Sequence, residues 1–231
     1  MFVAETKQAA TAATTLSNDA RVSWKDIATP AQPILAKVNA QLASQFSAFE
    51  PEIGGYAQYA LASQGKQMRP VLVALSGMAS GRANENLVTV AVIIEMIHLA
   101  TLVHDDVIDS AQMRRRRPTL AANWGNEVSV LLGDCLFAQA LKLAGSFATN
   151  EVCRAVASAT KTVCSGEILQ AQQRGNFQLA DEEYFRILAM KTAELFALSC
   201  DLGAAQAKAP PAIRTALRNY GMALGTAYQI Y

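Results

Sequence analysis

The chain carries its most informative pattern in one continuous stretch, "VTVAVIIEMIHLATLV" at residues 88–103 followed by "HDDVIDSAQMRRRRP" at residues 104–118. The first part is apolar except for a few positions such as Glu95 and His98. The second part sets three aspartates a few residues before four consecutive arginines, although only 17% of the chain is charged. Such a stretch indicates an apolar helix that ends at a strongly charged site.

The remainder of the chain repeats a helical pattern. From about Thr29 onward, stretches of about 12 to 25 residues rich in Ala, Leu, Ile, Met and Gln are broken by Gly, Pro or Asn. Apolar positions recur at helical spacing, as at Ile34, Leu35, Val38 and Leu42. Breaks near "PEIGG", "GMASGRANEN", "RRRRPT", "SFATNE", "GNFQLADEE" and "KAPPA" predict a bundle of about eight helices. We therefore expect an all-α fold with a single helical domain over residues 29–231.

Composition and the N-terminal segment limit the classes of protein. Residues 1–28 contain acidic side chains and lack the long apolar core of a signal peptide, so we expect a flexible tail. The apolar stretch at residues 88–103 is shorter than the roughly 18 to 20 residues that a bilayer span needs. A hydrophobic content of 52% supports a large core, and a net charge of +1 gives no field that would recruit nucleic acid. We expect no membrane span and a cytoplasmic location.

The three aspartates are spaced to act together. Asp105 and Asp109 are four residues apart, so their carboxylates lie on one helix face, with Asp106 about a quarter turn away. An ordinary solvated helix end would hold such charges with salt bridges one turn away, but none of the residues three or four positions after them is basic. The arginines begin five residues after Asp109 and stop at Pro118. We therefore expect them beyond the helix end, facing something other than these carboxylates.

The residue types of the two charged clusters indicate one kind of ligand. Mg²⁺ takes one or two protein carboxylates and keeps waters and substrate phosphates as its other ligands. Arginine guanidinium groups bind phosphate oxygens bidentately. Together the clusters predict a bound diphosphate with its metal.

A second basic site lies in "GKQMRP", residues 65–70. Lys66 and Arg69 directly precede Pro70, a residue favoured at the first helical position, and helix N-termini attract phosphate. Gln67 stands where a nucleotide P-loop needs a hydroxyl, so this is no P-loop. His98 lies seven residues before Asp105, on the same helix face and about 10 Å deeper. It is either a satisfied core histidine or a donor to phosphate, and the sequence leaves both interpretations open.

Seven segments in order, "GKQMRP", "EMIH", "LVHDDVIDSAQMRR", "GNEVSVLLGD", "GEILQ", "MKTAELF" and "GTAYQIY", resemble the trans-type isoprenyl diphosphate synthases of the polyprenyl branch. The resemblance runs from about Pro33 to the last residue. It implies an all-α bundle of the isoprenoid synthase type. It also implies a prenyltransferase that condenses isopentenyl diphosphate with an allylic prenyl diphosphate, head to tail, with Mg²⁺ as cofactor. A homodimer is expected on the same basis, and the net charge of +1 predicts that no nucleic acid is bound.

The resemblance also implies a role for each matched residue. The diphosphate of isopentenyl diphosphate would be bound by Lys66, Arg69, His98 and Arg115. Asp105 and Asp109 would ligate Mg²⁺ on the allylic diphosphate, with support from Asp106. The allylic group itself would be held by Arg114, Lys191, Thr192 and Gln229. The residues that would take part in catalysis are Asp105, Asp106, Asp109 and Lys191.

Product length follows from two further positions. Bulky residues four and five positions before the first aspartate form the pocket floor of short-chain members of this family. Here those positions are Thr101 and Ala100, both small. The resemblance therefore implies a long-chain product.

The chain departs from the family at its C-terminal end. Family members carry a second aspartate-rich motif after the segment that resembles "GTAYQIY", whereas this sequence stops at Tyr231. We expect either a fragment or a chain completed by a partner, and no measurable chain elongation by residues 1–231 alone. A non-catalytic subunit is therefore one alternative. A class I terpene cyclase is another, but it needs no isopentenyl diphosphate site such as the one expected around Lys66 and Arg69.

Overall fold

The computed structural model describes residues 22–62, 65–81 and 84–231. Residues 1–21 of the expected tail lie outside the described residues. Trp24–Ala28, which the tail prediction also included, instead form a short helix, α2, that begins with a capping box between Ser23 and Asp26. A short 3₁₀ helix, η1, follows at Thr29–Ala31. The chain divides into one unit up to Pro30 and a second from Ala31 to Tyr231, and the second unit carries the candidate site.

The second unit is a helical bundle, which confirms the all-α prediction. Its helices are α3 (Gln32–Phe46), α4 (Pro51–Leu61), α5 (Met68–Ala79), α6 (Glu85–Ile108), α7 (Leu120–Trp124), α8 (Asn126–Ala144), α9 (Glu151–Gln172), α10 (Asp181–Leu188), η2 (Ala189–Ala193), α11 (Glu194–Gln206) and α12 (Pro211–Ile230). Within the described ranges there are more helices than the eight or so predicted, because short ones such as α7 carry too little sequence for their period to be read.

One predicted helix break is misplaced by a few residues, and another is confirmed but contains strands. The "PEIGG" segment starts a helix: α4 begins at Pro51, and Gly54 and Gly55 lie inside it. The segment "RRRRPT" contains a small antiparallel ribbon of β1 (Met113–Arg114) and β2 (Arg117–Pro118). The ribbon folds Arg114 back to Asp106 near the end of α6, whereas Arg117 lies over the ring of Tyr59 on α4.

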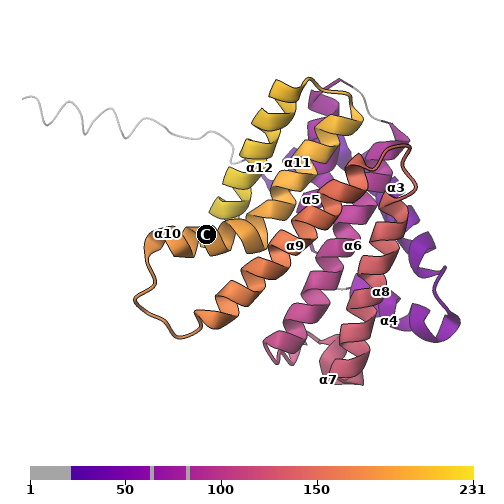
Figure 1. Cartoon of the computed structure of the whole chain (residues 1–231). Coiled ribbons are helices and arrows are strands. Elements are labelled where there is room, and N and C mark those ends of the chain that lie inside the picture. Colours follow the sequence, from indigo (N-terminus) through magenta and orange to yellow (C-terminus); the bar gives the residue numbers. More distant parts are fainter. Residues whose placement is uncertain (1–21, 63–64, 82–83) are drawn as a thin grey trace, which may run out of the picture. The chain divides into compact units, whose positions relative to one another are not determined.

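Helix α6 forms the centre of the bundle. It contacts α3, α5, α8 and α11, and residues on all sides of it are buried, as expected for a helix that is apolar all round (Figure 1). Its length and composition would suffice to cross a membrane, but 72% of its most apolar window is buried inside the fold, as in a core helix. The predicted apolar helix at residues 88–103 is therefore the core helix of this bundle.

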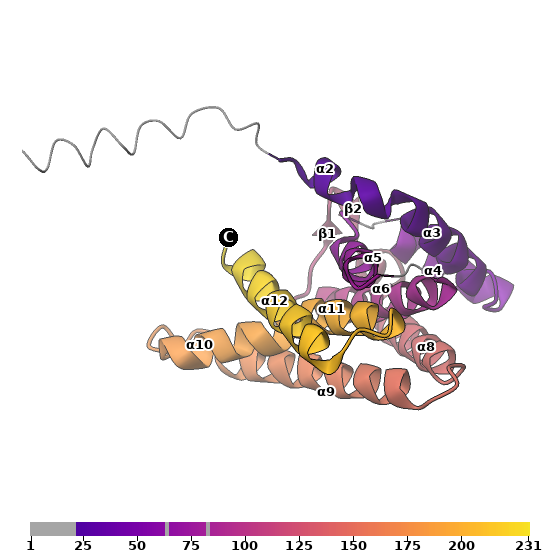
Figure 2. The same ribbon diagram turned by 90° about the horizontal axis from the view of Figure 1, so that it is seen from above.

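Helix α12 lies directly against α11 and brings its last turn to the site (Figure 2). Helix α12 also approaches η2 closely at Gly225, where a Cβ atom would come within 2.6 Å of the Cα atom of Ala193, the last residue of η2. Only glycine allows backbones to approach this closely. The result is that Tyr228 and Gln229, three and four residues later, reach the same region as the C-terminal half of α6.

Candidate active site

Two cavities adjoin at the C-terminal half of α6. The Lys66 cavity, of about 260 Å³, is lined by Gly65, Lys66, Gln67, Met68, Arg69, Glu95, His98, Arg115, Phe196 and Tyr228. The Asp105 cavity, of about 290 Å³, is lined by Arg69, His98, Thr101, Leu102, Asp105, Arg114, Arg115, Val163, Glu167, Lys191, Thr192, Leu195, Tyr228 and Gln229. The two share four residues, Arg69, His98, Arg115 and Tyr228. Residues far apart in the sequence therefore form a site with two adjoining cavities.

The Lys66 cavity holds all the residues predicted to bind isopentenyl diphosphate. Helix α5 begins at Met68, so the prediction that Pro70 takes the first helical position is wrong by two residues, and Arg69 lies within the first turn. The Arg69 guanidinium stacks on the Phe196 ring, 4.8 Å from its centroid. Burial lowers the pKa of Arg69 to about 10, which still leaves it protonated at neutral pH. This cavity therefore contains a fixed, buried positive charge.

Arg115 reaches this cavity from the turn of the β ribbon. Arg115 and Arg116 both have positive φ angles, 49° and 66°, in the left-handed region that glycine usually occupies. Such a conformation costs a non-glycine residue about 1–2 kcal/mol. The Arg115 guanidinium lies against Gly65, where a Cβ atom would come within 2.3 Å of it. The glycine of "GKQMRP" thus leaves room for a cation from a distant segment.

His98 lies between the cavities and lines both of them. Burial, followed by the nearby charges of Arg69 and Arg115, lowers the pKa of His98 well below its usual value. The ring is therefore neutral, with one nitrogen able to donate a hydrogen bond and the other to accept one. Of the two interpretations that the sequence leaves open, this position beside both cavities supports the donor to phosphate.

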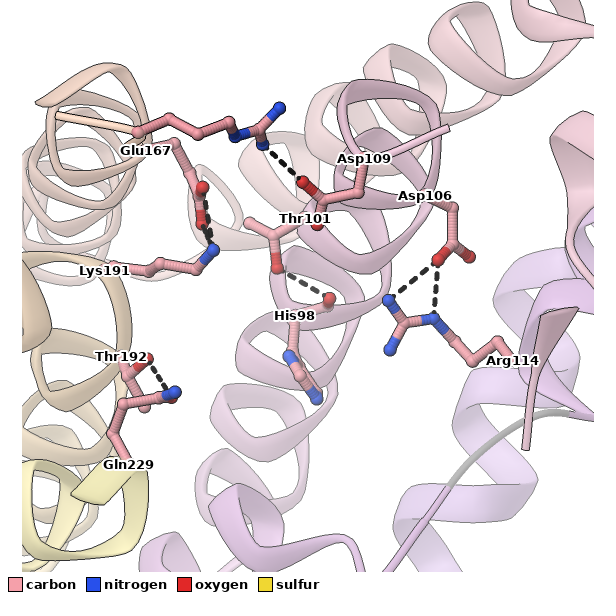
Figure 3. A network of polar contacts seen from close by, with 10 residues as sticks. His98, Thr101, Asp106, Asp109, Arg114, Glu167, Lys191, Thr192 and Gln229 are labelled. Carbon is pink, nitrogen blue, oxygen red and sulfur yellow. Dashed lines mark hydrogen bonds and ion pairs between the residues drawn. The ribbon is translucent and has the colours of Figure 1, made fainter. Parts of the chain in front are cut away.

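The three aspartates do not have the same surroundings, and Figure 3 shows two of them, Asp106 and Asp109. Asp106 is buried and accepts hydrogen bonds from Nε and Nη2 of Arg114, both at 2.8 Å. Asp109 follows the last residue of α6 and pairs with Arg174, also at 2.8 Å. The expectation that the arginines face something other than these carboxylates is therefore wrong for Arg114. The ribbon bends it back to Asp106, a contact that helical spacing could not anticipate.

Asp105 makes no ion pair with the residues that the structure describes. Burial raises the pKa of Asp105 to about 6, and the neighbouring Glu167 and Asp109 carboxylates add to the rise, while Lys191 opposes it. All three aspartates also lie at the C-terminal end of α6, the negative end of the helix dipole. A carboxylate at the negative end of a helix is stabilised when a cation binds to it. Asp105 has no paired cation among the described residues.

The donors present fit Mg²⁺ held together with a diphosphate. Among residues 22–62, 65–81 and 84–231 no group of three or more His, Cys, Asp or Glu side chains forms a metal cage. Mg²⁺ requires fewer protein ligands than a cage supplies, because one or two carboxylates plus substrate phosphates complete its coordination. Asp105, which lines the cavity, and Asp109, which lies one turn later and pairs with Arg174, are the carboxylates on offer for such a site.

Lys191 and Thr192 project from η2, a π-helical turn between α10 and α11. Such turns are frequent at functional sites because the extra residue redirects side chains. Lys191 pairs with Glu167 at 2.7 Å, and the Thr192 hydroxyl donates to Oε1 of Gln229 at 2.8 Å (Figure 3). A Cβ atom at Gly166 would lie 2.7 Å from the backbone nitrogen of Lys191, so this glycine allows α9 to approach η2.

Several residues of the site were not predicted from the sequence. They are Glu95, Glu167, Arg174, Phe196 and Tyr228. The segments "EMIH" and "GEILQ" contain the two glutamates, so the signal for them was present in the motifs themselves. Phe196 and Tyr228 likewise lie in the segments "MKTAELF" and "GTAYQIY", whereas Arg174 lies outside the seven segments and had no such signal.

Comparison with known proteins agrees with this geometry. The family model described as polyprenyl synthetase matches residues 50–231. An octaprenyl diphosphate synthase of Haemophilus influenzae is 34% identical over 90% of this chain and 64% of its own length. The heptaprenyl diphosphate synthase component 2 of Bacillus subtilis is 40% identical over 74% of this chain and 49% of its own.

A solved structure of a relative was determined with ligands. The polyprenyl synthase of Caulobacter crescentus, complexed with calcium and isoprenyl diphosphate, is similar with a TM-score of 0.86 and 34% identity, over 90% of this chain and 63% of that one. This chain thus spans 49% to 64% of the length of these relatives. The family match covers most of the sequence, and the fold agrees along nearly all of it. The chain belongs to the polyprenyl synthetase family.

Proposed function

We propose that this protein is a prenyltransferase that joins isopentenyl diphosphate to an allylic prenyl diphosphate, head to tail. One observation carries the proposal: a cationic cavity and a cavity with both carboxylates and cations adjoin and share Arg69, His98 and Arg115. A reaction between two diphosphates requires two anion sites with their organic parts close together. The two cavities adjoin at the residues that they share, so two diphosphates bound there would have their organic parts close together.

The Lys66 cavity is proposed to bind isopentenyl diphosphate. Lys66, Arg69 and Arg115 offer positive charge to the diphosphate, and neutral His98 offers one hydrogen-bond donor. Arg69 is buried, so its attraction for an anion is screened less by solvent than that of a surface arginine.

The Asp105 cavity is proposed to bind the allylic diphosphate. Asp105 and Asp109 would hold Mg²⁺, with Asp106 fixing Arg114 beside them. Bound there, Mg²⁺ would supply positive charge to the diphosphate leaving group. Lys191, Thr192 and Gln229 would contact the same diphosphate after giving up their present partners.

The chemistry needs no protein nucleophile. Neutralisation of the departing diphosphate lets the allylic carbon–oxygen bond break, which leaves an allylic carbocation. The double bond of isopentenyl diphosphate attacks that carbon, and the proton lost afterwards passes to the released diphosphate. Leu102, Val163 and Leu195 form an apolar wall of the Asp105 cavity that would keep water from the cation.

We also propose a long-chain product. Thr101 lines the Asp105 cavity, whereas Ala100 is fully buried in the hydrophobic core, so the two residues do not share one surface. The small side chain of Thr101 in the lining would leave room for the growing prenyl chain. Replacement of Thr101 by Tyr should therefore shorten the products, and an unchanged product distribution would contradict this assignment.

A transfer assay separates this function from its alternatives. The purified chain, alone and joined to the C-terminal segment of the octaprenyl relative, would be given labelled isopentenyl diphosphate, a short allylic diphosphate and Mg²⁺. We expect label in elongated product with the joined form. A terpene cyclase would consume the allylic substrate without incorporating label, and a non-catalytic subunit would form product only after a partner synthase is added.

Size-exclusion chromatography of the same samples tests the proposed homodimer. Helix α8 exposes large apolar side chains at Val130, Leu131 and Leu141, which is typical of a helix with a partner. A cytoplasmic location and the absence of a nucleic acid partner stay predictions from the sequence.

A further inference from the structure

The Lys66 cavity contains a carboxylate where an anion is to bind. Glu95 lines this cavity with an exposed fraction of only 3%. Its Oε2 atom is buried and has no hydrogen-bond partner within the described parts of the chain. A buried polar atom without a partner costs about 1–3 kcal/mol. An unpartnered carboxylate oxygen is unexpected in a buried position, and especially in a cavity that is proposed to bind a diphosphate.

The charges around Glu95 come from several elements. Arg69 on α5 and Arg115 on the β ribbon both favour its ionised form, and burial opposes them. Neutral His98 lies one turn later on α6, while Lys66 and Tyr228 complete the titratable lining of the cavity. Burial has the larger effect, so the pKa of Glu95 is raised to about 7. The carboxylate is thus poised between its two protonation states near neutral pH.

A diphosphate in this cavity would change that balance. Its negative charge would repel the Glu95 carboxylate and attract the guanidinium groups that now stabilise it. An ionised carboxylate only accepts hydrogen bonds, so it cannot pair with a phosphate oxygen. A protonated carboxyl group can donate one from Oε2, which would satisfy the buried atom and add a contact to the ligand.

We propose that Glu95 takes up a proton from solvent when a diphosphate enters the Lys66 cavity and donates a hydrogen bond to it through Oε2. Glu95 is thus a positioning residue when the cavity is empty, holding Arg69 and Arg115, and a ligand contact when it is filled. The inference rests on the proposed function, because it requires isopentenyl diphosphate to bind here.

Proton uptake can be measured directly. Isopentenyl diphosphate would be titrated calorimetrically into the chain at about pH 8, without divalent metal, in buffers of different ionisation enthalpy. The wild-type chain should take up nearly one proton more than Glu95→Gln, whose amide cannot titrate. The ionisation of the ligand itself contributes equally to both proteins and cancels in the difference.

The affinities provide a second readout. Above about pH 7, wild-type affinity should fall by up to about tenfold per pH unit relative to Glu95→Gln, because each binding event must also capture a proton. Glu194→Gln is the matched control: Glu194 is also a buried glutamate, but it pairs with Arg218 and lines neither cavity. It should show wild-type proton uptake.

The outcomes distinguish the two proposals. If the wild-type chain does not bind isopentenyl diphosphate, the proposed function of the cavity is wrong and this inference with it. If binding occurs with equal proton uptake in the wild-type and Glu95→Gln chains, or if Glu95→Gln folds but no longer binds, the inference alone is overturned. Should Glu95→Gln fail to fold, infrared difference spectra of the wild-type chain decide, since a protonated carboxyl band must appear on binding.

Discussion

The Lys66 cavity and the Asp105 cavity lie side by side but hold their charges differently. In the first, a buried arginine stacks on an aromatic ring and faces a glutamate with one unpaired oxygen. In the second, two of the lining cations are already paired with acids, Lys191 with Glu167 and Arg114 with Asp106, while Asp105 has no ion pair among the described residues. The first cavity is therefore preorganised for an anion, whereas the second must exchange partners before it binds one.

This difference indicates which charges the ligand of each cavity must carry. Removing one partner of a buried ion pair is costly, because the other charge is left unpaired. A ligand that carries both signs, such as a diphosphate with its metal, offers new partners to the carboxylate and to the cation together. We therefore expect metal dependence in the Asp105 cavity and none in the Lys66 cavity.

Removal of metal is the strongest test of this comparison. A chelator should abolish prenyl transfer in the active form and weaken binding of the allylic diphosphate by about 10²-fold or more, because several kcal/mol of charge stabilisation is lost. Binding of isopentenyl diphosphate, followed by calorimetry, should stay within about twofold. Equal loss for both ligands would mean that the two cavities do not differ in this way.

Asp105→Asn should lower the transfer rate by about 10²- to 10³-fold, since it removes a preorganised electrostatic element next to the leaving group. The measurement is kcat with both substrates saturating. Asp181→Asn, at an exposed position in the first turn of α10, is the control and should leave kcat unchanged. A variant at Asp105 with the wild-type rate would remove this residue from the metal site.

Arg69→Ala should raise the KM for isopentenyl diphosphate by about 10- to 100-fold, the loss expected for a hydrogen bond between charged groups. The KM for the allylic substrate should change much less, although Arg69 borders both cavities. Arg154→Ala, at an exposed position on α9, controls for loss of a positive charge. An equal effect on both substrates would cancel the assignment.

Glu167→Gln should extend metal binding to lower pH. The raised pKa of Asp105, about 6, has burial as its largest cause and Glu167 as the next. Metal binding needs ionised Asp105, so it is present above this pKa and is lost as the pH falls through it. Without the Glu167 charge the pKa falls, and the loss moves to lower pH. Titrations of Mg²⁺ with the allylic ligand at several pH values would measure the shift, with Glu182→Gln on α10 as control.

Gly65→Ala should have the smallest effect. The added methyl group would meet the Arg115 guanidinium, which lies at the end of a flexible side chain and can move away. We expect the KM for isopentenyl diphosphate to rise by about threefold, within the range of a weakened exposed ion contact. The KM for the allylic substrate should not change. A larger change in thermal stability than in KM would show that Gly65 serves the fold and not the cavity.

Much of the site could be predicted from short motifs. The aspartates, Lys66, Arg69 and His98 lie within segments whose spacing places them on one helix face or at one helix start. The structure brings Asp105 and these three residues to the two adjoining cavities, whereas Asp106 and Asp109 are not among the residues that line them. The predicted helix start at Pro70 was wrong by two residues, because Gln67 adopts a left-handed conformation and α5 begins directly after it. Glutamine rarely adopts the left-handed conformation, so the sequence did not indicate that Gln67 would adopt it and that the helix would begin directly afterwards.

The partners of these side chains could not be predicted. Arg114 is eight residues from Asp106, a separation that no helical period brings together, and only the β ribbon joins them. Lys191 meets Glu167 across 24 residues because Gly166 lets two helices approach. In both cases the contact depends on how the backbone folds beyond the few residues around each partner.

The helical class of this protein, its central apolar helix and the residue types of its two anion sites could all be read from the order of its amino acids. These follow from helical periodicity and side-chain chemistry, which act over one or two turns. Tertiary packing brings the two sites to a shared wall and leaves Asp105, alone among the three aspartates, without an ion pair within the described residues. It also leaves the Oε2 atom of Glu95 without a hydrogen-bond partner there. The physical reason is that charge pairing and burial depend on distances between helices far apart in the chain, and packing fixes those distances.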